Sequence, residues 1–231
     1  MHADLPPASP DSSSTSTGPW YRELTRYHWF VFVVAALGWL FDTMDQQLFT
    51  LARPLAMEDL IQLTPEETES ARTVGAQPDE APAAAEKRVN DKLTAKRAQY
   101  GGYATSFFLI GWATGGLFFG VLGDRWGRVR TMLVTILMYS FFTGLSALSR
   151  NFWDFSILRF LTGLGVGGEF AVGVALVAEV MPSRARPHAL GLLQALSAVG
   201  NITAALIGMA GTDWKVMFMI GTAPALLSLL V

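Results

Sequence analysis

The sequence predicts an all-α membrane protein with six transmembrane helices. Its 231 residues are 51% hydrophobic and only 16% charged, whereas soluble domains usually carry about 25% charged residues. A bilayer core of about 30 Å is crossed by about 20 apolar residues in a helix. Six runs approach that length: 29–51, 100–122, 131–149, 155–181, 188–211 and 214–231.

Four segments make up the predicted organisation. Residues 1–19 are rich in Pro, Ser and Thr and have no apolar core, which predicts a disordered tail rather than a secretory signal. Residues 20–51 are expected to form the first transmembrane helix with its cytoplasmic lead-in, and residues 100–231 to hold helices two to six. Residues 52–99 carry 16 of the 36 acidic and basic side chains, so we expect an extramembrane insert. Pro82–Gln99 is a candidate surface helix in it, and a disordered loop is the alternative.

Composition also excludes several classes of function. The formal net charge of −2 leaves no basic footprint for nucleic acid, and the absence of Cys excludes disulfides and thiolate sites. The three His residues are scattered, without the spacing of metal ligands. The insert contains no nucleophile elbow or phosphate loop. We therefore predict no enzyme activity, no catalytic residues, no cofactor and no metal.

A charged turn separates the second and third apolar runs. Gly120–Arg130, GVLGDRWGRVR, places four charges within seven residues. Such a turn cannot lie in hydrocarbon, so it must lie at a membrane face. With a cytoplasmic N-terminus, seven basic residues of the short loops lie on the cytoplasmic side and two on the other side. We therefore expect both termini in the cytoplasm.

Four charged side chains lie well inside the predicted membrane spans, away from their ends. Asp42 and Asp45 share one face of the first helix, where burial and mutual repulsion make them a candidate proton carrier, with a structural cap at an early helix end as the alternative. Arg159 cannot lose its charge, and Asp45 is its expected partner, although an anionic solute or a purely structural ion pair is an alternative. Glu169 lies about 15 Å further along the same helix as Arg159 and is expected to face a central cavity, with a buried structural hydrogen bond as the alternative.

Several motifs in order resemble those of major facilitator transporters. Gly120, Asp124, Arg125, Gly127 and Arg128 are similar to the family's GxxxDRxGR signature, with Val129 where a further basic residue is often found and Arg130 one position on. The segment from Arg159 to Glu169 resembles RxxxGxGxGGE. The segment from Glu179 to Arg186 resembles the ExxPxxxR of sugar porters. The first-helix segment from Gly38 to Asp45 also resembles proton-coupled metabolite and aromatic-acid symporters.

The resemblance implies one half of a major facilitator fold, built as two inverted three-helix repeats. It implies alternating access, with proton coupling at Asp45 and Arg159. Asp42 and Glu169 fit the metabolite symporters better than the sugar porters. It also implies a cytoplasmic gate, whose expected members are Gly120, Asp124, Arg125, Gly127, Arg128, Arg130, Glu179 and Arg186.

We therefore expect a proton-coupled secondary transporter, or its N-terminal half, for a small organic solute. The expected partners are membrane lipid, the solute, the proton, and either a second copy of the chain or a separate six-helix half. A truncated chain is also consistent, because a complete transporter of this kind has twelve helices. The alternative function is a transporter-like membrane protein that binds or senses a ligand without transporting it.

Overall fold

The computed structural model describes residues 19–76 and 81–229, so nearly all of the predicted tail lies outside the described residues. Within these ranges every regular element is a helix. The elements are η1 (Trp20–Glu23), α1 (Arg26–Leu60), α2 (Pro65–Thr73), α3 (Pro82–Trp126), α4 (Arg128–Ser146), α5 (Phe152–Val180), α6 (Arg186–Met209), α7 (Trp214–Ile220) and η2 (Ala223–Leu229). The all-α prediction is confirmed.

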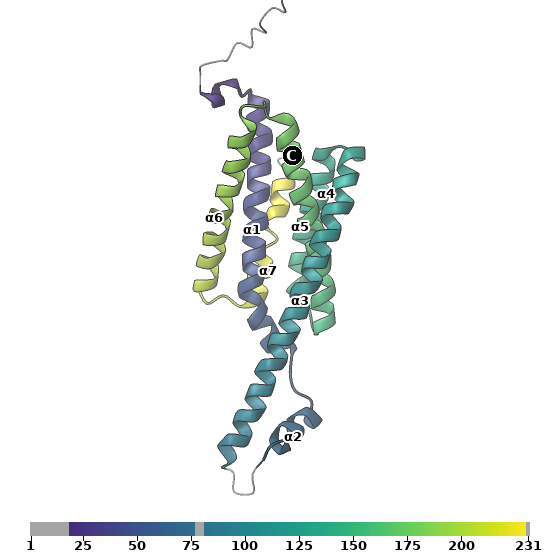
Figure 1. The fold of residues 1–231 in the computed structure, drawn as a ribbon, viewed down its shortest axis with the longest axis vertical. Helices are drawn as coiled ribbons and strands as arrows, with labels where there is room; N and C mark the ends of the chain where they lie inside the picture. The colour runs from purple at the N-terminus through teal and green to yellow at the C-terminus, as the bar shows by residue number, and fades with distance from the viewer. Residues whose placement is uncertain (1–18, 77–80, 230–231) are drawn as a thin grey trace, which may run out of the picture.

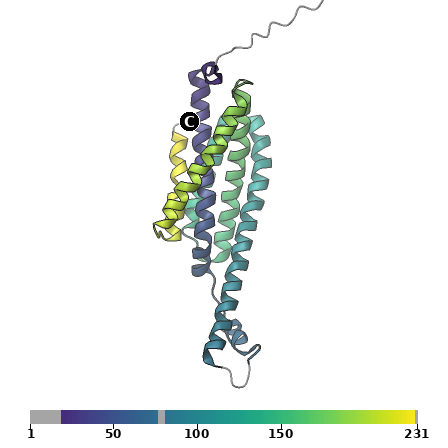
Figure 2. The same cartoon turned by 60° about the vertical axis from the view of Figure 1, so that its left-hand side comes forward.

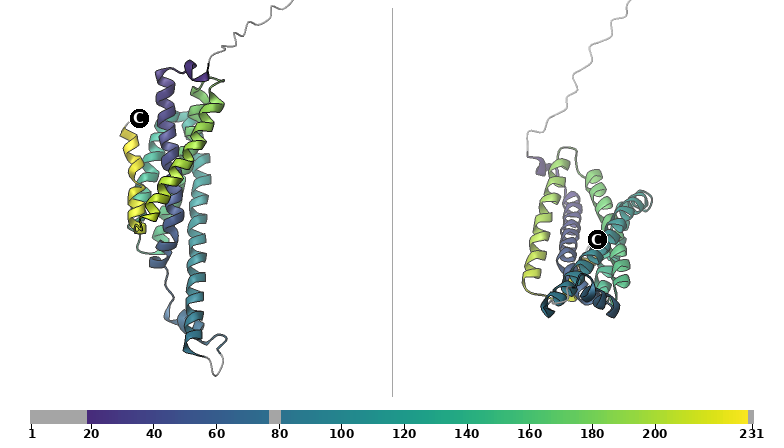
Figure 3. Two further views of the ribbon diagram at one scale, coloured as in Figure 1. Left: turned by 90° about the vertical axis from the view of Figure 1, so that its left-hand side faces the viewer. Right: turned by 60° about the horizontal axis from the view of Figure 1, so that its bottom comes forward.

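The long helices form an elongated bundle that has two distinct ends (Figure 1). We call the end with the α3–α4 connection the turn end, and the end where α1 finishes and α2 lies the insert end. α2 and the first part of α3 extend beyond the rest of the bundle at the insert end (Figure 2). α5 packs against both α3 and α4, while α6 packs along α1. Figure 3 shows α6 crossing in front of α1 and α3 in its left-hand view.

The second predicted span belongs to a much longer helix. Five helices are long and apolar enough to cross a membrane: α1, α3, α4, α5 and α6. α3 has 45 residues and is therefore about 68 Å long, roughly twice the thickness of a bilayer core. Pro82–Gln99 is helical as predicted, but it continues into the membrane helix without a break. Gly101 and Gly102 do not interrupt it, because isolated glycines weaken a helix by only about 1 kcal/mol each.

The sixth predicted span is not a single α-helix. α7 has seven residues, and η2 follows it after a turn at residues 221–222. Pro224 lies near the start of η2 and has no N–H with which to continue an α-helical hydrogen-bond ladder. This local chemistry explains why an apolar run of membrane length divides into two short elements.

Four glycines bring α3 and α5 into backbone contact. Gly111 and Gly115 of α3 face the backbones of Phe160 and Leu164, so a Cβ at either glycine would overlap a carbonyl oxygen. Gly163 and Gly167 of α5 lie in the same way against the α3 backbone. Small residues at four-residue spacing allow such close approach in membrane helices. The tight α3–α5 contact fixes the position of α5, which carries Arg159 and Glu169.

Basic side chains of α3 hold the insert against the rest of the chain. Lys96 donates to the Gln62 carbonyl at 3.0 Å and to the Glu67 carboxylate at 2.6 Å. Lys92 donates to the Glu67 carbonyl at 3.0 Å. Arg97 donates to the carbonyls of Ile61 and Glu58, at 3.3 and 3.0 Å, at the end of α1. The described part of the insert is therefore an ordered helical extension.

Candidate solute and proton site

A cation at the turn end joins three helices. Gly127 connects α3 to α4 with a φ of 94°, a conformation that glycine adopts at little cost. Arg128 then lies beside Asp124, at 2.5 Å, and beside Glu179 at the end of α5, at 2.8 Å. Its Nη1 also donates to the Gly120 carbonyl at 3.4 Å. The motif residues and Glu179 thus form one contact.

Three predicted gate residues lie outside this contact. Arg125, Arg130 and Arg186 are exposed, and in the described part of the chain none of them lies within ion-pair distance of a carboxylate. Arg186 begins α6, and Glu179 accepts two hydrogen bonds from Arg128.

Arg159 is fully buried in the middle of the bundle. Its Nε and Nη2 donate to the Ser146 hydroxyl at 3.2 and 2.7 Å, and Nη2 also donates to Thr162 at 3.1 Å. The guanidinium carbon lies 4.4 Å from the centre of the Phe218 ring. A buried cation is therefore held by hydroxyls and by the negative face of an aromatic ring.

The expected ion pair between Asp45 and Arg159 is not present. Asp45 is fully buried and interacts electrostatically with Arg159, but the two side chains are not within 4.0 Å of each other in the described chain. The position where a Gly221 Cβ would lie is 2.9 Å from the Asp45 Oδ1. Asp45 therefore faces the α7–η2 turn. Hydroxyls accept from Nε and Nη2 of Arg159, while in the described residues its Nη1 and the Asp45 carboxylate oxygens are buried without a hydrogen-bond partner.

Asp42 and Asp45 have different surroundings although they lie one turn apart on α1. The Asp42 carboxylate accepts two hydrogen bonds of 3.2 Å from the Gln46 amide. Glu169, on α5, lies against α1 at Gly38, where an added Cβ would be 2.5 Å from its Oε1. Asp42 and Glu169 also interact electrostatically. Asp42 interacts electrostatically with Asp45 as well, so the buried charges form two linked groups, Asp42 with Glu169 and Asp45 with Arg159.

A polar pocket of about 390 Å³ opens beside Asp42. α1, α3, α5 and α6 all contribute to it. Its lining residues are Trp39, Asp42, Thr43, Gln46, Gln47, Thr50, Trp112, Phe170, Gln194, Ser197 and Asn201. In the described chain the indole N–H groups of Trp39 and Trp112 are buried without a hydrogen-bond partner. The pocket therefore combines aromatic, amide and carboxylate side chains, and two of its aromatic residues carry buried N–H donors without a partner in the described residues.

Sequence reasoning missed most of this lining. Gln46 follows Asp42 by four residues, the spacing that brings helical side chains together, so it was recognisable. Gln194, Ser197 and Asn201 form a polar stripe along the otherwise apolar α6, and this stripe was also a usable signal. Trp112 and Phe170 gave no such signal, because aromatic residues are common throughout these helices. No group of three or more potential metal ligands occurs in residues 19–76 and 81–229.

A family model described as Major Facilitator Superfamily matches residues 35–231. The chain belongs to this superfamily. As a member of it, with five helices long and apolar enough to cross a bilayer, the chain is a multi-pass membrane protein. The predicted family and the predicted fold class are confirmed.

Relatives within the superfamily include transport proteins for small acids. The chain is 29% identical to the niacin transporter NiaP of Acinetobacter baylyi, over 87% of this chain and 39% of that protein. It is 29% identical to a benzoate transport protein of the same organism, over 90% and 39% of the two chains. The chain thus spans about two fifths of the length of these curated relatives. None of them is named as an enzyme, which agrees with the prediction.

This chain has the same fold as part of a transporter of known structure. The xylose transporter XylE from E. coli, in an inward open and partially occluded conformation, superposes with a TM-score of 0.62. The identity is 20%, and the match covers 88% of this chain and 49% of the transporter. At this identity the likeness supports the fold alone, namely one half of a major facilitator fold.

Proposed function

We propose that this chain supplies one six-helix half of a proton-coupled secondary transporter for a small organic acid. The observation that carries the proposal is the polar pocket between α1, α3, α5 and α6, which is lined by buried Asp42, one of four buried ionisable side chains inside the helical bundle. Buried charges inside a membrane are costly and are typical of solute and proton pathways. A second six-helix unit, either another copy or a separate chain, would supply the opposite wall.

The chemistry of the pocket favours a planar solute with an acceptor group. The Trp39 and Phe170 rings lie 4.9 Å apart, and the Trp112 and Phe170 rings 5.6 Å apart. These rings offer stacking surfaces. The two unpartnered indole N–H groups can donate to carboxylate oxygens. The names of the relatives, a niacin and a benzoate transporter, support the same class of solute.

Proton coupling is assigned to the two buried groups. Protonation of Asp45 removes its attraction for Arg159, and protonation of Asp42 or Glu169 removes the repulsion between these two acids. Each change alters the relative free energies of states in which the helices are arranged differently. The Arg128 contact at the turn end is proposed as the gate, and the excess of basic residues there supports a cytoplasmic position for that end.

Uptake by purified protein in proteoliposomes tests the proposal. We expect accumulation of radiolabelled benzoate when the outside is more acidic than the inside, and loss of this accumulation in Asp45→Asn. Asp91→Asn, an equivalent change at an exposed position of the insert, should transport normally. Normal acid-driven uptake by Asp45→Asn would contradict the proposed coupling.

Separate measurements test the alternative function and the oligomeric assembly. Benzoate binding without uptake at every oligomeric state would favour a membrane-embedded binding or sensory protein. The mass of the particle in nanodiscs then distinguishes a second copy from a separate partner. A two-fold symmetric dimer with uptake would support completion of the pathway by a second copy.

A further inference from the structure

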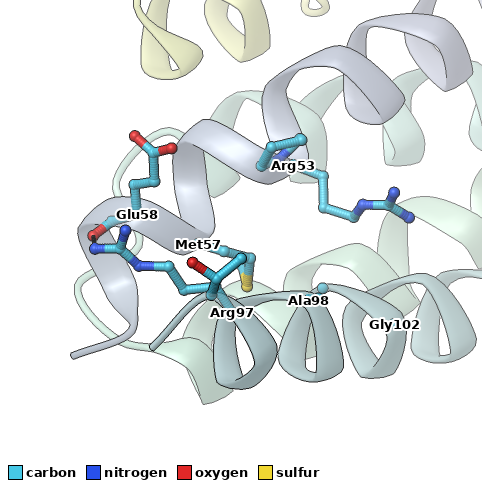
Figure 4. A pocket seen from close by; sticks show the side chains of 9 residues that line it. Arg53, Met57, Glu58, Arg97, Ala98 and Gly102 are labelled. Atoms are coloured by element: carbon cyan, nitrogen blue, oxygen red, sulfur yellow. Dashed lines mark hydrogen bonds between the residues drawn. The ribbon is translucent and has the colours of Figure 1, made fainter. Parts of the chain in front are cut away.

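A second pocket lies at the insert end, between the last turns of α1 and the middle of α3. Its volume is about 410 Å³, and its lining includes Arg53, Met57 and the acidic Glu58 from α1 and Arg97, Gly101 and Gly102 from α3. Figure 4 shows Arg53 extending from α1 away from Arg97, toward the side of Gly102, while Arg97 turns toward the end of α1. The two cations thus border the same pocket from different helices.

The two arginines differ in which of their guanidinium N–H donors already form hydrogen bonds. The Nε and Nη2 of Arg97 donate to the carbonyls that end α1, so its side chain is a structural cap. Arg53 uses Nη1, which donates to the Thr105 hydroxyl at 2.6 Å. Thr105 in turn donates to the Gly101 carbonyl at 3.0 Å. This chain of hydrogen bonds fixes the plane of the Arg53 guanidinium.

The edge of the Arg53 guanidinium that has no partner in the described residues is the edge with which arginines commonly bind carboxylates. Its Nε and Nη2 form no hydrogen bond within residues 19–76 and 81–229, and no carboxylate of that part lies within 4.0 Å. These two atoms point the same way and match the two oxygens of a carboxylate or another oxyanion. Beneath them, buried Met57 and Gly101 give the pocket an apolar floor.

The pocket also lies on the same strip of α1 as the Asp42 pocket. Arg53 is 11 residues from Asp42, about three helical turns or 16 Å. Gln46 and Thr50 lie between them on this strip and line the Asp42 pocket. Buried Phe49 lies on the same strip, so polar side chains flank an aromatic ring between Arg53 and Asp42.

We propose that Arg53 forms a second carboxylate-binding site, at which a small organic acid is held before it reaches the Asp42 pocket. The role in the route rests on the proposed transport function. Arg53 makes the bidentate contact, Thr105 positions it, and Arg97 contributes positive charge without direct contact. The apolar floor accommodates the remainder of the acid.

Chemical modification tests the site without requiring transport. The chain in dodecyl maltoside is treated with the arginine reagent phenylglyoxal, and each modified arginine is quantified by mass spectrometry. Benzoate at ten times its Kd should slow the modification of Arg53 about tenfold and leave that of exposed Arg150 unchanged. The neutral amide benzamide should not protect Arg53. Equal reactivity of Arg53 with and without benzoate would overturn the proposal.

Binding measurements on variants separate this site from the Asp42 pocket. Equilibrium dialysis of radiolabelled benzoate should show that Arg53→Gln weakens one class of site by about tenfold or more. Arg53→Lys keeps the charge but not the fork, so it should weaken that class as well. Arg150→Gln, the matched change of charge at the same end of the molecule, should bind as the original chain does. Unchanged binding by Arg53→Gln would overturn the proposal.

Two further arms identify the source of the oxyanion and separate the two proposals. If phosphatidylglycerol without benzoate protects Arg53 and benzoate does not, the ligand is a lipid phosphate and the proposal fails. Protection by benzoate in a protein without uptake would support the Arg53 site and overturn the transport function. Acid-driven uptake by a protein in which benzoate does not protect Arg53 would support the transport function and overturn the Arg53 site.

Discussion

The Arg128 guanidinium lies 2.8 Å from the Glu179 carboxylate and thereby joins the α3–α4 turn to the end of α5. The two side chains are 18% and 54% exposed, so water screens much of their attraction. Glu179→Gln should therefore lower the free energy of unfolding by only about 0.2–1 kcal/mol. Unfolding in detergent at low and high salt measures this loss, which should be smaller at high salt.

Arg125→Gln is the matched control for this contact. Arg125 is exposed and lies in the same turn, so its loss should change stability by less than about 0.5 kcal/mol. A double-mutant cycle between Arg128→Gln and Glu179→Gln should give a coupling energy of the same small size. A coupling of zero at low salt would mean that the contact contributes nothing to the closed turn end.

The α3–α5 contact should not tolerate a single methyl group. A Cβ at Gly115 would overlap the Leu164 backbone, and backbone cannot move aside as a flexible side chain can. Gly115→Ala should therefore cost about 1–3 kcal/mol or more of stability. Gly102→Ala, on the same helix with open space around it, should be neutral or stabilising by up to about 1 kcal/mol. Similar melting temperatures for both variants would contradict the observed packing.

The features of this protein that could be predicted are those that depend on the pattern of neighbouring residues in the sequence. The charged turn at residues 120–130 indicated a membrane face, because four charges within seven residues cannot lie in hydrocarbon. The partners of Arg159 were not predictable, because any of several hydroxyls and acids on neighbouring helices satisfied the same requirement. Asp45 was favoured as the nearest opposite charge, whereas Ser146 is the partner that the arrangement of α4 and α5 provides.

The insert also has features that could not be predicted from the sequence. Its charge marked it as distinct from the membrane runs, but charge does not show where a helix ends, so the continuity of α3 was missed. Lys96 and Arg97 bind backbone carbonyls at the ends of other elements. Every residue has a carbonyl, so sequence alone cannot identify which one a long basic side chain reaches.

The Ser146 hydroxyl is expected to be the most sensitive hydroxyl of the buried cluster. It accepts two hydrogen bonds from Arg159, and its removal leaves a buried guanidinium with fewer acceptors. Ser146→Ala should therefore cost about 1–3 kcal/mol. Ser156 is equally buried, but its hydroxyl has no hydrogen-bond partner in the described part of the chain, so Ser156→Ala should be near neutral. Thermal unfolding of the two variants makes the comparison, and an equal loss would contradict the assignment.

The insert should loosen in acid before the bundle does. The hydrogen bond from Lys96 lowers the pKa of Glu67 from its ordinary value of 4.5, and the Thr64 backbone N–H adds to this effect. An acid whose pKa is lowered by folding contributes stability above its unfolded pKa and loses it as the pH falls through the folded pKa. Opening of α2 should therefore become easier as the pH falls below about 4.5.

Hydrogen exchange of the α2 amides as a function of pH measures this opening, after correction for the intrinsic pH dependence of exchange. Glu67→Gln should abolish the acid-dependent step, because the glutamine has no proton to gain. Glu66→Gln, a change of the same charge in the same turn of α2, should keep it. An acid-dependent step of full size in Glu67→Gln would show that another group controls the insert. Retention of α2 protection at all pH values would show that the Lys96 contact does not hold it in place.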